Sequence, residues 1–63
     1  MKKKEFLEKL RKKLNILEDG EVDDIILEYE GYIDERIDNG ASEEEAVESF
    51  GDIDELADEL LRA

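Results

Sequence analysis

The chain has 63 residues, of which 48% are charged and 40% hydrophobic, and it contains no cysteine, histidine or proline. A disulfide framework and a zinc site built from cysteine or histidine are therefore excluded, and so short a chain predicts one small domain, residues 1–63. The net charge of −12 divides into +5 for residues 1–17 and −17 for residues 18–63, and so acidic a body disfavours direct binding to nucleic acid.

The first predicted element is a basic amphipathic helix over about residues 3–17. Its apolar side chains recur every three or four residues, which is the spacing of one helix face. Lysine and arginine lie mostly off this face and gather late in the helix, where positive charge suits the negative end of the helix dipole. We expect the apolar face to pack on the acidic remainder of the chain, and it consists of Phe6, Leu7, Leu10, Leu14 and Leu17.

A second helix is predicted over about residues 21–38. Asp19 is the expected N-cap, because its carboxylate can accept a hydrogen bond from a free backbone N–H of the first turn. Gly40 ends the helix, because glycine adopts the left-handed conformation without a clash at Cβ. The predicted buried face consists of Val22, Ile25, Ile26, Tyr29, Ile33 and Ile37.

Four residues of this second helix are candidate contacts for a partner. Leu27 falls on the side opposite the buried face, near Gly31 and Asp34. A leucine beside a glycine marks a place where another helix can approach closely, although a lone exposed leucine is also common on protein surfaces. Tyr32 lies at the edge of the buried face, where its ring suits either the rim of the core or a partner contact.

Two short helices are predicted over about residues 43–50 and 53–62. Ser42 with Glu45, and Asp52 with Glu55, have the spacing of capping boxes, in which side chains and backbone satisfy each other's free donors. Neither helix can bury its apolar face alone, so we expect the pair to close over the first two helices as an all-α bundle. The predicted core residues here are Ala46, Val47, Phe50, Ile53, Leu56, Ala57, Leu60 and Leu61.

No catalytic, cofactor-binding or metal site is predicted, and we do not expect an enzyme. Ser42 and Ser49 have no histidine that could act as a base. The acidic segment that starts at Asp34 has Arg36 and Asn39 at the positions where a calcium loop of the EF-hand type requires an oxygen ligand and a glycine.

Three segments resemble the HTH-associated α-helical signalling (HAAS) domain. They are KKKEFLEKLRKKL, DIILEYEGYIDERIDNG and ASEEEAVESFGDIDELADELL, and together they cover nearly the whole chain. The most specific part is the run from Gly40 through Ser42 and the three following glutamates to the Phe50-Gly51-Asp52 turn and Ala57. The chain departs from the family pattern at Ile53, where a proline is usual, and at residues 19–20, where many members have a leucine–proline break.

The resemblance implies a role that the residue pattern alone does not. HAAS domains are bacterial, have no known enzymatic activity, and usually form the N-terminal cytosolic part of small membrane proteins with C-terminal transmembrane helices. Their genes often neighbour a PadR-type winged-helix regulator, through which they are proposed to relay signals. The resemblance therefore implies a cytoplasmic interaction module, tethered to the inner face of the membrane in its parent protein, although this chain itself has no segment for membrane insertion.

The leading hypothesis is thus a noncatalytic module that binds a protein partner, with a PadR-type regulator as the candidate. One alternative is an acidic nucleic-acid mimic that blocks a DNA-binding surface, and it rests on the charge of the chain. The other is a self-association domain, a homodimer with Leu27 and Tyr32 at its seam.

Overall fold

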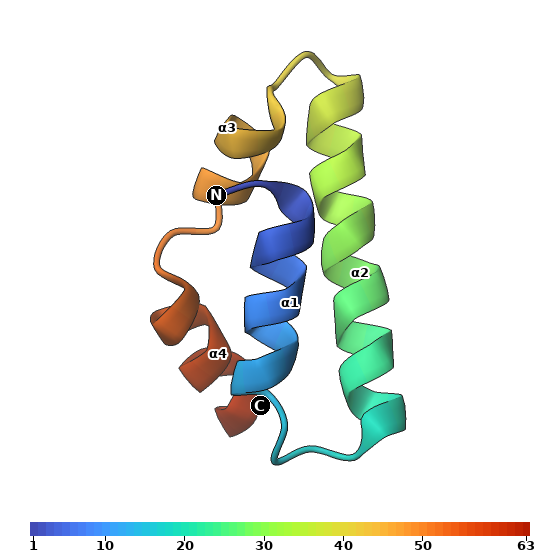
Figure 1. Ribbon diagram of the computed structural model, residues 1–63, viewed down its shortest axis with the longest axis vertical. Coiled ribbons are helices and arrows are strands. Elements are labelled where there is room, and N and C mark those ends of the chain that lie inside the picture. The colour runs from blue at the N-terminus through green and yellow to red at the C-terminus, as the bar shows by residue number, and fades with distance from the viewer.

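The computed structural model describes residues 1–63 and contains four helices and no strand. They are α1 (Lys3–Lys13), α2 (Asp19–Asp38), α3 (Glu43–Glu48) and α4 (Ile53–Arg62). α1 lies in the middle, α2 runs beside it in the opposite direction, and α4 packs on its other side (Figure 1). α3 contacts both α1 and α2. This arrangement confirms the predicted all-α bundle of two longer and two shorter helices.

The end of α1 differs from the prediction, because the helix stops at Lys13 rather than at Leu17. The chain continues as a turn in which the N–H of Leu14 is shared between the carbonyl oxygens of Leu10 and Arg11. The N–H of Leu17 then donates to the carbonyl of Leu14 at 3.0 Å, three residues back instead of four. Such tightening is common at helix ends, and it keeps Leu17 partly buried.

The start of α2 also differs, because the predicted N-cap Asp19 is the first helical residue. Glu18 occupies the cap position, and its side chain makes no capping hydrogen bond. Asp19 and Glu21 instead place negative charge in the first turn, where it faces the positive end of the helix dipole. The predicted end of α2 at Asp38 is confirmed.

Capping by Ser42 and Asp52 is confirmed in both short helices. Ser42 Oγ accepts from the N–H of Glu45 at 3.1 Å, and Glu45 Oε1 accepts from the N–H of Ser42 at 3.0 Å, which completes a capping box. Asp52 accepts from the N–H groups of Asp54 and Glu55 without a return bond from the Glu55 side chain. α4 has its predicted bounds.

α3 is shorter than predicted and ends at Glu48 rather than at Phe50. Ser49 Oγ donates to the carbonyl of Ala46 at 2.6 Å, a local bond that competes with continuation of the helix. Gly51 then has a φ of +76°, which a residue with a side chain rarely adopts. The chain therefore turns sharply between α3 and α4.

The core contains eight fully buried residues, and all of them are apolar. Every one was predicted to face the core from helical spacing. No buried side-chain nitrogen or oxygen lacks a hydrogen-bond partner. The core residues are Phe6, Leu10, Leu14, Val22, Ile33, Ala46, Val47 and Ala57.

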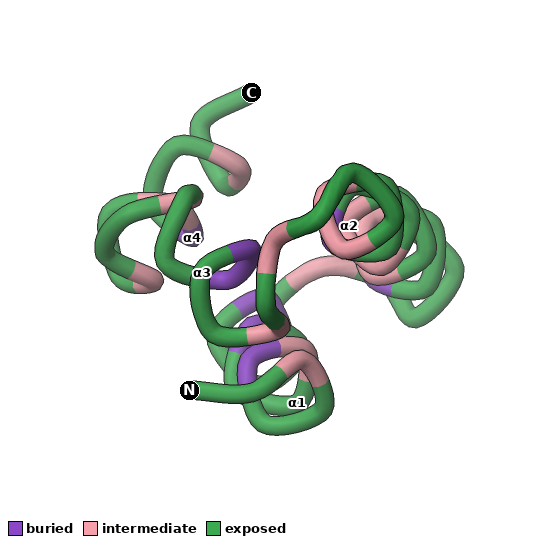
Figure 2. The backbone as a smooth tube through the Cα atoms, turned by 90° about the horizontal axis from the view of Figure 1, so that it is seen from above, coloured by how far each residue is buried: buried purple, intermediate pink, exposed green.

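The pair of short helices closes over both long helices as predicted, although α4 itself packs only on α1. α3 packs on α1 and α2, whereas the backbone of α4 packs on that of α1 and not on that of α2. Figure 2 shows α2 and α4 on different sides of α1. Ala57, which is small and buried, lets α4 approach α1, and Lys13 of α1 forms an exposed ion pair with Asp54 of α4.

Candidate interaction surface

The four candidate contacts on α2 do not form one patch. Successive residues of a helix are rotated by roughly 100°, so Tyr32 and Asp34 lie roughly 200° apart around the axis. Asp34 lies on the flank of α2 that faces α1, whereas Tyr32 contacts Phe50 in the turn that follows α3. Leu27 and Gly31 lie between these two flanks, on the side that faces solvent.

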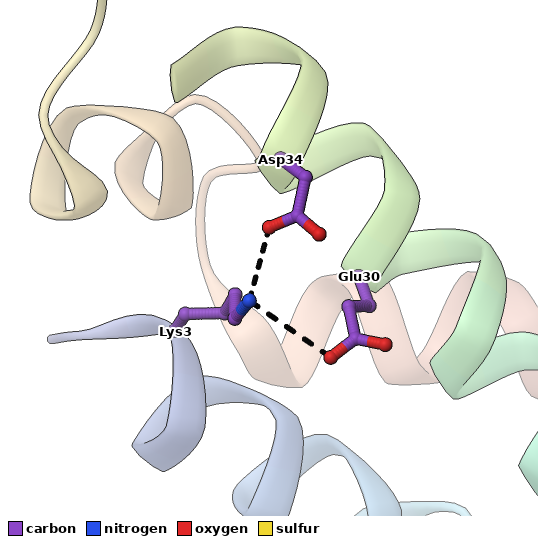
Figure 3. Close-up of polar contacts among 3 residues, drawn as sticks. All are labelled: Lys3, Glu30 and Asp34. Atoms are coloured by element: carbon purple, nitrogen blue, oxygen red, sulfur yellow. Dashed lines mark hydrogen bonds and ion pairs between the residues drawn. The ribbon is translucent and has the colours of Figure 1, made fainter. Parts of the chain in front are cut away.

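Asp34 is engaged within the molecule. Lys3 Nζ donates to Asp34 Oδ1 at 3.0 Å and lies 3.9 Å from Glu30 Oε2 (Figure 3). The hydrogen bond to Asp34 is the main reason that the pKa of Lys3 is raised above its ordinary value. Asp34 therefore joins the start of α1 to α2, and any partner that used it would have to compete with Lys3.

Leu27 and Gly31 are open to a partner. Leu27 is 65% exposed, and Gly31 is exposed in the middle of α2. A Cβ atom built on Gly31 would meet nothing within 4 Å, and its φ is negative. Neither packing nor backbone conformation of this chain therefore requires a glycine at position 31.

All four aromatic rings belong to one cluster at the junction of α1, α2 and α3. Phe50 stacks on Phe6 at 5.7 Å between centroids, and Tyr29 meets Phe50 edge-on at 5.2 Å. Tyr32 packs edge-on against Tyr29 at 5.4 Å and remains 40% exposed. The guanidinium of Arg36 lies 4.5 Å from the centre of the Phe50 ring, a cation–π contact.

The cluster continues into a partly exposed apolar surface that the sequence pattern did not reveal. Ile25, Tyr29 and Tyr32 follow each other at helical spacing along one flank of α2. On α4, Leu56 and Leu60 lie on the side away from Asp54, which pairs with Lys13 of α1. We call this surface the α2–α4 strip; it consists of Ile25, Tyr29, Tyr32, Phe50, Leu56 and Leu60.

Positive charge in α1 is largely matched within the chain. Lys3 pairs with α2, Arg11 Nη1 contacts Asp23 Oδ1 at 2.8 Å, and Lys13 pairs with Asp54. The hydrogen bond to Asp54 raises the pKa of Lys13. α2 itself contains nine acidic residues and one arginine, a balance of −8, so most of its carboxylates have no cationic partner in the chain.

The hollows of the surface lie beside α1. One of about 350 Å³ is open to solvent between α1 and α2 and is lined mainly by charged side chains, including Lys3, Lys4 and Arg11. Another of about 380 Å³ lies between α1 and α4 beside Lys9, Lys12 and Lys13. No group of three or more acidic side chains is arranged to hold a metal ion, and no helix is both long and apolar enough to cross a membrane.

Comparison with known proteins identifies the family. The sequence profile of the HAAS family matches residues 5–59, which is most of the chain. No curated protein and no solved structure matches it. The matched segment begins inside α1 and ends inside α4, so it contains parts of all four helices. The chain therefore belongs to the HAAS family.

Proposed function

We propose that this HAAS domain is a noncatalytic signalling module that binds a basic surface of a protein partner. The candidate partner is a PadR-type winged-helix regulator, as the family resemblance implies. The domain then acts in the cytoplasm, at the inner face of the membrane where the parent protein carries transmembrane helices. Its action is binding alone, and the signal is passed by the partner.

The observation that supports this proposal is that the basic residues of α1 are largely paired within the chain, whereas most carboxylates of α2 are not. The basic residues of α1 that face α2 and α4 pair with Asp23, Asp34 and Asp54. The solvent-facing side of α2 keeps unpaired carboxylates, including Asp24, Glu28 and Glu35. A protein with such a surface attracts basic partners and repels acidic ones.

The same charge weighs against the two alternatives. α2 carries its net −8 over roughly 30 Å, or one charge per roughly 4 Å, whereas duplex DNA carries one charge per roughly 1.7 Å. A single helix of this density is a weak imitation of a nucleic acid. A homodimer with Leu27 and Tyr32 at its seam would bring two such acidic helices together, and like charges at a contact oppose association.

Titration of the domain into the matching regulator, followed by calorimetry at low and high salt, tests the proposal. We expect binding at low salt and a loss of affinity of about tenfold or more when the Debye length falls from ~10 Å to ~3 Å. Absence of binding at both salt concentrations would exclude this regulator as the partner. Simultaneous binding of DNA and the domain would exclude the mimic.

A further inference from the structure

The α2–α4 strip is an apolar surface that no helix covers. The backbones of α2 and α4 pack on α1 but not on each other, and the two helices lie apart with α3 near one end of the space between them (Figure 2). The strip packs inward on the core, where Leu10 and Leu14 are 0% exposed. Outward, its residues remain partly exposed, and Tyr32 is the most accessible of them.

Acidic residues border the strip on both sides. On α2, Glu28 accepts a hydrogen bond from the Tyr32 hydroxyl at 2.9 Å, and Glu21 lies one turn before Ile25. Burial is the main cause that raises the pKa of Tyr29, and the charges of Glu28 and of Glu59 on α4 raise it further. None of these three glutamates is in an ion pair.

We infer that the α2–α4 strip binds an amphipathic helix of the partner, with apolar side chains on one face and lysine or arginine along its borders. This inference rests on the proposed function and adds the surface and the chemistry of the partner. From Ile25 to Tyr32 the strip extends roughly 10 Å along α2, enough for about two turns of a bound helix. A second copy of this chain fits poorly, because its own strip has the same acidic borders.

The experiment uses a peptide of about 18 residues, five helical turns, with leucines on one face and lysines beside them. A control peptide has glutamate in place of lysine, and neither contains an aromatic residue. The chain has two tyrosines and no tryptophan, and both tyrosines lie in the strip, so its intrinsic fluorescence reports binding there. NMR of the isotopically labelled domain identifies the residues that the peptide contacts.

Two charge reversals separate local docking from attraction by net charge. Glu59→Lys changes the border of the strip, whereas Glu8→Lys makes the same change of charge in the hollow between α1 and α2. Neither glutamate is in an ion pair, so both variants are expected to fold. We expect Glu59→Lys to weaken binding of the lysine peptide by about five- to tenfold, and Glu8→Lys by less than about twofold.

The inference would be supported if the lysine peptide, but not the glutamate peptide, shifts the amide signals of the strip residues Ile25, Tyr29, Leu56 and Leu60. Equal effects of the two reversals, or shifts centred on Leu27, would overturn it. If the peptide binds the strip but the regulator does not bind the domain, the proposed partner is wrong and the surface stands. If the regulator binds while the peptide contacts another face, the surface is wrong and the proposed function stands.

Discussion

Replacement of Gly31 by alanine should stabilise the free domain. Glycine in the middle of a helix is less favourable than alanine by about 0.5–1 kcal/mol, because more backbone freedom is lost on folding. Gly31 lies well inside α2, has a negative φ, and has open space at the position of a Cβ atom. The full difference should therefore appear as an increase in the free energy of unfolding.

The assay is thermal unfolding followed by circular dichroism, with urea unfolding as a second measurement. For a domain of this size, 1 kcal/mol corresponds to roughly 4–8 °C, so Gly31→Ala should raise the midpoint by several degrees. Gly40→Ala is the matched control, because its Cβ would also meet nothing within 4 Å but its φ is +107°. That variant should lose about 1 kcal/mol or more. A decrease in stability of Gly31→Ala would refute the reasoning, since it would mean that α2 is distorted or crowded at this point.

Three further predictions concern capping, ionisation and salt. Ser42→Ala should lower the free energy of unfolding by about 1 kcal/mol in urea titrations. Hydrogen bonds from the backbone and side chain of Ser42 lower the pKa of Glu45 below its ordinary value of 4.5. The capping box should therefore stabilise the domain at neutral pH and lose this contribution as the pH falls through the lowered pKa. If Ser42→Ala melts with the same acid dependence as the unchanged domain, the box contributes nothing. Burial is the main cause that raises the pKa of Tyr29, and the hydrogen bond to Glu28 is the main cause that raises the pKa of Tyr32. In an alkaline absorbance titration both pKa values should lie above the ordinary value of 10.0 in the folded domain and return to 10.0 in denaturant. The domain should lose stability as the pH rises through the raised values. Moderate salt should raise the thermal midpoint at neutral pH, because it screens repulsion among the carboxylates of α2, and an unchanged midpoint would argue that this repulsion is small.

Local chemistry was sufficient to predict most of the fold. The capping residues Ser42 and Asp52 and the glycine at position 40 act within a few residues of their own helix, so their roles can be read from the sequence. The eight core residues follow helical spacing for the same reason. The end of α1 was wrong because Leu14 and Leu17 keep an apolar spacing of three, which a tight turn satisfies as well as a helix does.

Contacts between helices could not be predicted in the same way. Spacing placed Leu27, Gly31 and Asp34 on one side of α2, but it gave no sign that Lys3, 31 residues away, pairs with Asp34. Ile25, Tyr29, Leu56 and Leu60 were correctly predicted to face inward. Their partial exposure depends on the separation of α2 from α4, which is a property of how three helices pack and not of any one helix.

The most direct test of the account is an NMR titration of the isotopically labelled domain with the matching regulator at low and at high salt. We expect the affected amide signals to gather on the α2–α4 strip and its glutamate borders, and binding to weaken sharply as salt rises. Unchanged spectra at low salt would contradict the proposed partner, and binding indifferent to salt would contradict the electrostatic basis of the interaction.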